Sequence, residues 1–365
     1  MGAMNELIDA SAISGLRRRL DVATGGRPLA ALSTVSASLG DLSLRERTDL
    51  VAAAILSDLP DDYESVAAIF RTALSDKSFR GWTMWPVSES AVTLALSSSN
   101  PAAFDDALAL LAELTPRLTS EFAIRRLLEA DYPRAISIVR QFAASDDEHV
   151  RRLASEGTRA FLPWAIRVRS VLADPRAAVP ILDALYRDES DYVRRSVANH
   201  VNDLSRQNPE LVVDLAGRWL ADPDENTARL VRHALRTLIK RGDPAALALL
   251  GFAPATVSVT EAILDRAIVE LPGSLGFSVD VTNDATASAR LVVDYVIHFA
   301  KSNGTLAHKV FKLAAVTVAP GETVTLSKRH AFRQMTTRVH YSGIHALEVQ
   351  VNGERYSRAE FSLVV

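Results

Sequence analysis

A row of polar and charged side chains on one predicted helix is the clearest sign of chemistry in this sequence. The row consists of Arg152, Ser155, Glu156 and Arg159. Its members follow at intervals of three and four residues, so a helix places them on one face. One carboxylate then lies between two guanidinium groups, which are well suited to bind phosphate. The alternative is that Glu156 only neutralises its two neighbours on a solvated surface.

Three further side chains are candidates for the same site, and each also has an ordinary structural explanation. Glu121 precedes Arg125 by four residues, the favourable order for a helical ion pair, and it could also help to begin a helix. Asp203 follows Arg195 by eight residues on the same predicted helix, where it could be a plain surface carboxylate. His200 lies among valines, a pattern that is more typical of a core or boundary histidine than of a base.

Two tryptophans lie beside prolines in the helical part of the chain. Trp85 is in the segment MWPVSES and Trp164 is in LPWA. Buried packing is the ordinary role of such side chains. In a basic groove, an exposed indole can instead stack on a base or sugar.

A weak internal repeat organises the arginines. The segments 150–152 and 193–195 both read Val-Arg-Arg and lie 43 positions apart, and 124–126 is a looser copy. Repeats of about 40 residues, each a helix pair, are typical of a HEAT-like solenoid with a concave inner surface. The repeated arginines would occupy equivalent places on that surface and could follow a phosphate backbone.

The pattern changes from helical to β near residue 255. Apolar residues recur at three and four in a set of predicted helices at 31–40, 47–59, 63–74, 88–97, 103–114, 178–188 and 209–222. Period-two alternation, typical of strands, follows at 275–284, 289–302, 309–329 and 345–365. We therefore expect a mainly α chain with a helical domain at 1–255 and an immunoglobulin-like β-sandwich at 256–365.

The bulk composition limits the classes of function. The net charge of −3 excludes a globally basic field, although a local basic groove remains compatible with it. The absence of cysteine excludes disulfides and thiolate chemistry. We expect a cytoplasmic protein, because neither a secretory signal nor an apolar run of about 20 residues is found. The sequence also lacks a Walker A loop, a Rossmann glycine fingerprint, a G-x-S-x-G elbow and a metal-binding constellation.

Three segments resemble the AlkC branch of the AlkC/AlkD bacterial DNA glycosylases. They are TMWPVSE at 83–89, RRLASEGTR through LPWA at 151–165, and SDYVRRSVANHVNDLSRQNPELV at 190–212. The resemblance covers most of residues 1–255, and the β part agrees with AlkC proteins that carry an immunoglobulin-like module. Where the AlkD branch has a tryptophan, this chain has Asn199-His200, which places it with AlkC.

The resemblance implies hydrolysis of the N-glycosidic bond of N3-alkylated bases, 3-methyladenine and 3-methylcytosine, in duplex DNA. It implies no metal, no cofactor and no conventional base-flipping pocket. Such a base is already cationic and leaves without protonation, while carboxylates stabilise the positive charge on the sugar and position water. The catalytic carboxylates would then be Glu156, Glu121 and Asp203.

The same resemblance assigns the remaining candidates to DNA binding. Arg152 and Arg159 would hold phosphates that flank the lesion, and Trp164 would pack against the lesion nucleotide. The other expected contacts are Arg194, Arg195, His200 and Trp85. From its charge alone, the predicted turn at Lys328, Arg329 and His330, joined by Arg333 and Arg338, suggests a second contact made by the β domain.

Two other classes of function also fit the predicted fold. HEAT-like arrays are most often platforms for protein partners, so a non-enzymatic scaffold is the main alternative. A lyase that acts on a pigment or metabolite is a third, without a nucleophile or pocket signature in its favour. An open groove for DNA favours a monomer.

Overall fold

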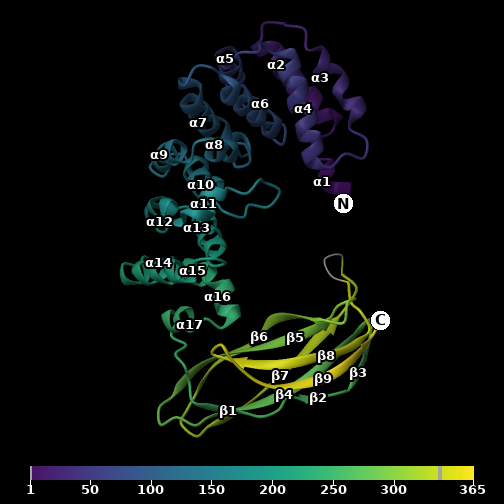
Figure 1. The fold of residues 1–365 in the computed structure, drawn as a ribbon, viewed down its shortest axis with the longest axis vertical. Helices are drawn as coiled ribbons and strands as arrows, with labels where there is room; N and C mark the ends of the chain where they lie inside the picture. The colour runs from purple at the N-terminus through teal and green to yellow at the C-terminus, as the bar shows by residue number, and fades with distance from the viewer. Residues whose placement is uncertain (1, 336–338) are drawn as a thin grey trace. The chain divides into compact units, whose positions relative to one another are not determined.

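Helices fill the chain up to Leu249 and strands follow from Val257, as the change of pattern near residue 255 predicts. The computed structural model describes residues 2–335 and 339–365. Residues 1–208 with 219–234 form one compact unit, and 209–218 with 235–365 form a second. The first unit is built of helices and the second combines short helices with the strands (Figure 1).

The helices are short, and most of them end at a polar loop. In chain order they are α1 (Gly2–Asn5), α2 (Ala10–Ala23), α3 (Ala30–Thr34), η1 (Val35–Ser38), α4 (Leu44–Asp58), α5 (Tyr63–Leu74), α6 (Met84–Ser97), α7 (Ala102–Leu114), η2 (Thr115–Arg117), α8 (Ile124–Ala130), α9 (Tyr132–Phe142), α10 (Glu148–Gly157), α11 (Arg169–Ala173), η3 (Pro175–Ala178), α12 (Val179–Leu185), α13 (Asp191–Leu204), α14 (Pro209–Ala221), α15 (Thr227–Ala234), α16 (Arg236–Arg241) and α17 (Pro244–Leu249).

Helix pairs recur through the second half of the helical unit. α9 packs on α10, and α12 packs on α13. In each pair a short connection joins the two helices. The second helices also pack on one another in the order α10, α13, α15. α10 and α13 contain the two Val-Arg-Arg segments, so the sequence repeat corresponds to neighbouring helices. The HEAT-like solenoid as a whole remains a prediction.

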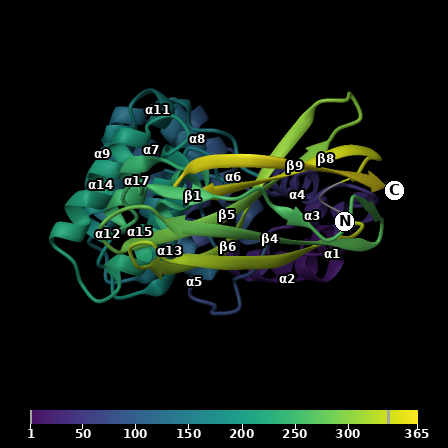
Figure 2. The same ribbon diagram turned by 90° about the horizontal axis from the view of Figure 1, so that it is seen from below.

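The β domain consists of two sheets. One sheet has the order β1 (Val257–Val259), β4 (Gly273–Asn283), β2 (Ile263–Leu264), with β7 (Thr323–Phe332) also paired to β4. The other has the order β3 (Ile268–Glu270), β9 (Glu354–Val364), β8 (Gly343–Val351), β5 (Ala289–Ala300), β6 (Leu306–Val318). Figure 2 shows the long strands of this domain running side by side.

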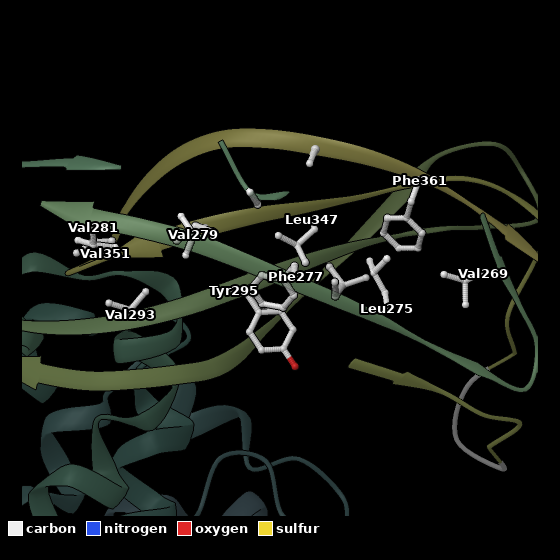
Figure 3. Packing of buried hydrophobic residues seen from close by; sticks show 14 of the residues in the cluster. Val269, Leu275, Phe277, Val279, Val281, Val293, Tyr295, Leu347, Val351 and Phe361 are labelled. Atoms are coloured by element: carbon white, nitrogen blue, oxygen red, sulfur yellow. The ribbon is translucent and has the colours of Figure 1, made fainter. Parts of the chain in front are cut away.

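Side chains from both sheets share one hydrophobic core (Figure 3). Leu275, Phe277 and Val279 alternate along β4 and are buried, and they belong to the same cluster as Tyr295 of β5 and Leu347 of β8. This alternation is what a strand with one face on a core requires, so the period-two pattern leads directly to the two-sheet arrangement.

A tight turn joins β8 to β9, as the Asn352-Gly353 dipeptide predicts. Both residues have positive φ, 45° at Asn352 and 89° at Gly353, which Asn and Gly tolerate best. Gly353 lies directly against Gly242, where a Cβ on Gly242 would be 2.6 Å from the Gly353 Cα. Glycine at both positions therefore lets α16 approach the hairpin within the second unit.

No helix within the described ranges is long and apolar enough to cross a membrane.

Candidate active site

α10 carries Arg152, Ser155 and Glu156 of the polar row that the sequence singles out, and Arg159 follows two residues after its end. Asp147 begins the helix by accepting a hydrogen bond from the backbone N–H of His149 at 2.7 Å. The row does not face open solvent, because Ser155, Glu156 and Arg159 are all buried. α13 packs over this face, so the polar side chains of α10 meet polar side chains of α13.

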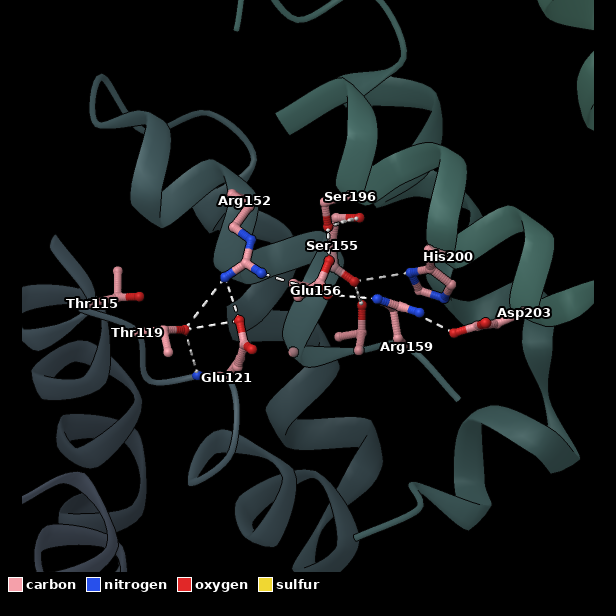
Figure 4. Close-up of polar contacts among 12 residues, drawn as sticks. Thr115, Thr119, Glu121, Arg152, Ser155, Glu156, Arg159, Ser196, His200 and Asp203 are labelled. Carbon is pink, nitrogen blue, oxygen red and sulfur yellow. Dashed lines mark hydrogen bonds and ion pairs between the residues drawn. The ribbon is translucent and has the colours of Figure 1, made fainter. Parts of the chain in front are cut away.

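Five charged side chains form a continuous chain of contacts, here called the charge network: Glu121, Arg152, Glu156, Arg159 and Asp203 (Figure 4). Arg152 forms a close ion pair with Glu121, and its Nη2 lies 3.5 Å from Glu156 Oε1. Arg159 Nη1 lies 2.6 Å from the same Glu156 oxygen, and its Nε lies 2.9 Å from Asp203 Oδ2.

The charges in this network alternate in sign. With all five groups ionised, three carboxylates stand against two guanidinium groups, an excess of one negative charge. The side chains of Glu121, Glu156 and Asp203 are only 11%, 7% and 4% exposed. Because water screens this region poorly, the three carboxylates act strongly on any cation placed beside them, while the charges of Arg125 and Arg206 also act on Asp203.

Hydroxyl groups fix the orientation of two of the carboxylates. Thr119 Oγ1 donates to Glu121 Oε2 at 2.9 Å. Ser196 Oγ donates to Glu156 Oε2 at 2.5 Å and lies 3.1 Å from Ser155 Oγ. Glu156 is thus held by a guanidinium on Oε1 and a hydroxyl on Oε2, whereas both partners of Glu121 contact the same oxygen, Oε2.

Burial makes the outer carboxyls of the network harder to ionise. It raises the pKa of Glu121, helped by the charge of Glu156 and opposed by Arg152. It also raises the pKa of Asp203, against the hydrogen bond and charge of Arg159. A positive charge brought next to these groups would favour their ionised forms, so the site is suited to bind a cation.

His200 lies beside the network but is fully buried, so the prediction that it contacts DNA is wrong. Its Nδ1 is 3.0 Å from the carbonyl oxygen of Ser155, which can only accept, so Nδ1 carries the hydrogen. Burial, followed by the charge of Arg159, lowers its pKa to about 3. The imidazole is therefore neutral and joins α13 to α10.

Trp85 is likewise a core residue, so the prediction that it contacts DNA is wrong. It is 1% exposed and stacks on Phe122 with ring centroids 4.1 Å apart. Its Nε1 donates to Glu89 Oε1 at 3.1 Å, and Glu89 also pairs with Arg45 and Arg126. The adjacent proline falls within the first turn of α6, where it is compatible with a helix.

Trp164 has the opposite placement. It lies in the segment between α10 and α11 and is 59% exposed, in the same helical unit as the charge network. Its φ of 65° is in the left-handed region, which is unfavourable for a side chain of this size. An exposed indole held in a strained backbone is available for stacking.

The first arginines of the repeated pairs have a structural role. Arg151 Nη1 donates to the carbonyls six and five residues before it, those of Ser145 and Asp146. Arg194 Nη1 makes the same two contacts, to Asp188 and Glu189. The guanidinium of Arg194 thus closes the loop before α13, and the phosphate contact predicted for it stays a prediction.

The second arginines are placed differently from one another. Arg152 is part of the charge network, whereas Arg195 is 60% exposed and lies 3.3 Å from Asp191. Asp191 also pairs with Arg229, which is 74% exposed. Arg195 thus remains available for a phosphate, but it does not share the buried face of Asp203.

Glu121 does not lie within a helix, so the helical ion pair that its spacing to Arg125 suggests does not form. It lies in the turn before α8. Its expected partner, Arg125, is fully buried and donates to backbone carbonyls instead. Arg152 from α10 takes its place, so Glu121 joins the network through a contact distant in sequence.

The basic segment of the β domain is a strand rather than a turn. Lys328 and Arg329 lie in β7, paired with β4. Arg329 Nη1 lies 3.0 Å from Asp265 Oδ2, and Lys328 is exposed. Arg333 is also exposed, and Arg338 lies outside the described residues.

Several polar and aromatic residues of the site were missed by the sequence interpretation. Ser196 is one of them, although Ser196, His200 and Asp203 follow at i, i+4 and i+7 and mark a polar stripe on α13. Tyr192 is another, since the Arg152 guanidinium lies 4.9 Å from its ring centroid. Thr119, which donates to Glu121, is a third. Within the described residues, no group of three or more His, Cys, Asp or Glu side chains is placed to hold a metal ion.

Comparison with known proteins identifies the family. Residues 116–246 match the family described as "DNA alkylation repair enzyme", and residues 258–365 match "Uncharacterised protein YhaZ, C-terminal Ig-like domain". The uncharacterized protein YhaZ of Bacillus subtilis is 34% identical over 325 residues, which is 88% of each chain. The structure of the Pseudomonas fluorescens alkylpurine DNA glycosylase AlkC, bound to DNA containing an abasic site analog, matches with a TM-score of 0.89 and 34% identity over 100% of both chains. These matches confirm the resemblance found in the sequence, and the chain belongs to the AlkC-type DNA alkylation repair enzymes with a C-terminal Ig-like domain.

Proposed function

We propose that this protein is a DNA glycosylase that removes cationic N3-alkylated bases, 3-methyladenine and 3-methylcytosine, from duplex DNA. The observation that carries the proposal is the buried charge network, in which three carboxylates, with Glu156 at the centre, lie against two guanidinium groups. The similarity to AlkC, whose structure holds DNA with an abasic site analog, supports DNA as the substrate.

The chemistry follows from the charge of the lesion. When the bond between C1′ and the base breaks, its electron pair neutralises the cationic base, so no proton donor is needed. The positive charge moves to the sugar, where the carboxylates stabilise it more than they stabilise the ground state. A water oxygen then bonds to C1′ and its proton passes to a carboxylate. Among the three, Glu121 has the most exposed side chain and is the best placed to orient that water.

The two arginines of the network hold the carboxylates in place. Arg159 uses Nη1 on Glu156 and Nε on Asp203, and its side chain is only 10% exposed. Arg152 is somewhat more open at 16% and can turn part of its guanidinium toward a phosphate. Trp164 and Arg195, both more than half exposed, supply the further DNA contacts.

We assign catalysis to residues 1–255, arranged as a HEAT-like solenoid, and a second DNA contact to residues 256–365. In the β domain, Lys328 is the better candidate for that contact, because Arg329 already pairs with Asp265. The protein would act as a monomer and without a metal or cofactor.

Release of methylated bases tests the proposal directly. Purified protein is incubated with N-methylated duplex DNA in the presence of a chelator, and the free bases are separated by chromatography. We expect 3-methyladenine and 3-methylcytosine in the soluble fraction, and binding to the duplex that weakens steeply with salt. A folded sample that releases neither base would contradict the proposed function.

A further inference from the structure

A fully buried arginine lies beneath the segment that connects α10 to α11. Arg125, on α8, is 0% exposed. Its Nη1 donates to the carbonyls of Arg159 at 2.6 Å and Gly157 at 3.1 Å, and its Nε donates to that of Ile166 at 2.6 Å. Nη2 is 3.5 Å from the carbonyl of Ala160. One guanidinium therefore contacts both ends of the segment 158–168, here called the tryptophan loop.

Backbone carbonyls take the place of a counter-ion for this guanidinium. Among the described residues, none of the ion pairs involves Arg125. A buried charge without a carboxylate is costly unless its donors are satisfied. The carbonyl of Gly157 ends α10, and those of Arg159 and Ala160 follow shortly after it, near the helix end where the dipole concentrates partial negative charge. Burial lowers the pKa of Arg125 to about 10, so the group remains charged at neutral pH.

The tryptophan loop carries two side chains that the proposed reaction uses. Arg159, near its beginning, pairs with Glu156 and Asp203. Trp164, in its middle, is 59% exposed and has a φ of 65°. A left-handed backbone at such a residue persists only when the surrounding structure holds it. The bond from Arg125 to Ile166 lies two residues beyond Trp164, where it can provide that restraint.

The contact between α8 and the end of α10 is also tight. A Cβ on Gly157 would lie 2.7 Å from Ile124 Cγ2, so a larger residue would push the two helices apart. Arg125 follows Ile124 directly, and its donors reach the carbonyls just beyond this contact. α8 therefore restrains the tryptophan loop in two ways, through the contact of Ile124 with Gly157 and through the hydrogen bonds of the Arg125 guanidinium.

We propose that Arg125 is a positioning residue, which fixes the tryptophan loop so that Arg159 meets the carboxylates while Trp164 is presented to the DNA. The inference rests on the proposed function for its DNA-binding consequence. Its structural half, the restraint of residues 158–168, can be measured without any substrate.

Replacement of Arg125 by lysine tests the inference. Lysine keeps the charge, but its single ammonium cannot reach carbonyls on both sides of the loop. Hydrogen exchange on the full chain should show the amides of 158–168 exchanging at least about 10-fold faster, with those of α2 to α7 unchanged. Binding to a duplex with an abasic site analog should weaken about 10-fold, and single-turnover excision should slow by a similar factor.

A matched control is Arg151→Lys, because Arg151 also donates to two carbonyls but lies at the other end of α10. It should leave exchange in 158–168 at the wild-type rate. A double-mutant cycle with Trp164→Ala provides a second readout. If Arg125 acts on binding through the loop, its effect should shrink when the indole is absent, whereas general destabilisation would give additive losses.

The outcomes separate the two proposals. Faster exchange confined to 158–168, together with a binding loss coupled to Trp164, supports the inference. A folded Arg125→Lys protein with wild-type exchange and binding would overturn it. If the exchange and binding effects appear but the wild-type protein releases no base, the positioning role stands and the glycosylase proposal fails.

Discussion

Replacement of Glu156 by glutamine removes the central charge of the network while it keeps the size of the side chain. Arg159 donates to Glu156 Oε1 at 2.6 Å, and a glutamine oxygen at that position can still accept this bond. The glutamine NH2 group then takes the place of Oε2, where it can donate to Ser196 Oγ instead of accepting from it. Asp203 continues to pair with Arg159, and Glu121 with Arg152. We therefore expect a folded protein in which two carboxylates balance two guanidinium groups and the excess negative charge is gone.

The expected loss of rate follows from Coulomb's law. A carboxylate about 5 Å from the positive charge on the sugar, at an effective dielectric constant of about 20, contributes about 3 kcal/mol. This corresponds to a rate factor on the order of 10²–10³ in the chemical step. The cost in stability should be smaller, about 1–3 kcal/mol, because charge-assisted hydrogen bonds are replaced by neutral ones.

Single-turnover release of 3-methyladenine, with enzyme in excess over DNA, measures the chemical step. Glu113→Gln is a suitable control, since Glu113 also pairs with an arginine, Arg71 at 3.0 Å, but its side chain is 42% exposed and outside the network. The control should excise at the wild-type rate. A folded Glu156→Gln protein that binds DNA normally and also excises at that rate would refute the electrostatic argument.

Four further substitutions test DNA binding and stability. Trp164→Ala should weaken binding to an abasic duplex by about 1–3 kcal/mol in an anisotropy titration, with little change in melting temperature because the indole is 59% exposed. Arg194→Ala should lower the free energy of unfolding by about 1–3 kcal/mol in a denaturant titration, since it unpairs the carbonyls before α13. By contrast, Arg195→Ala should change the free energy of unfolding by no more than about 0.5 kcal/mol. It should reduce the slope of log K against log salt concentration for DNA binding by about one. Equal losses of stability in the Arg194 and Arg195 variants would contradict the different roles assigned to these arginines. Asp294→Asn addresses the β domain, where burial, opposed by Lys312, raises the pKa of Asp294 to about 6. Because this pKa lies above that of the unfolded chain, the stability associated with the protonated form is present below about pH 4 and is lost as pH rises through 6. At pH 8 the free energy of unfolding of the asparagine variant should thus exceed that of the wild type by up to about 3 kcal/mol in a denaturant titration. At pH 4 the two free energies should be similar. The same difference at both pH values would contradict this assignment.

The sequence was sufficient to locate the charge network but not to describe its surroundings. Helical phase placed Arg152, Glu156 and Arg159 on one face, and they do meet there. The same phase gives no information about what covers that face. α13 covers it, because a second polar stripe with Ser196 and Asp203 allows two polar helix faces to pack with satisfied hydrogen bonds.

The tryptophans show a limit of local sequence patterns. Trp85 and Trp164 each neighbour a proline, yet one is 1% exposed and the other 59%. Their exposure is decided by elements distant in sequence, namely Phe122 stacked on Trp85 and Arg125 holding the loop around Trp164. The family resemblance identified both segments, but it did not distinguish a core side chain from an exposed one.

The repeat was informative about which positions are equivalent but not about what they contact. Arg151 and Arg194, 43 positions apart, do make matching contacts, each with the carbonyls six and five residues before it. A period in the sequence reports that two positions have the same environment. Whether an arginine in that environment binds a DNA phosphate or the carbonyls of a loop depends on backbone geometry, and the period of the repeat carries no information about that geometry.

The groups around the network explain why such a site would select cationic bases without enclosing them. A neutral base is a poor leaving group unless it is protonated, so an enzyme that removes one needs an acid near the base. His200 is the imidazole beside the network, and it is buried, with a pKa lowered to about 3 and its Nδ1 hydrogen directed to the Ser155 carbonyl. The arginines are held by carboxylates and do not release protons at neutral pH. Neither His200 nor the arginines can therefore supply a proton to the base, while the carboxylates supply negative charge to the sugar, so selectivity would come from the charge that the lesion already carries. We expect release of 3-methyladenine but not of uracil or hypoxanthine when each is presented in the same duplex, and efficient release of a neutral base would show that a proton donor has been overlooked.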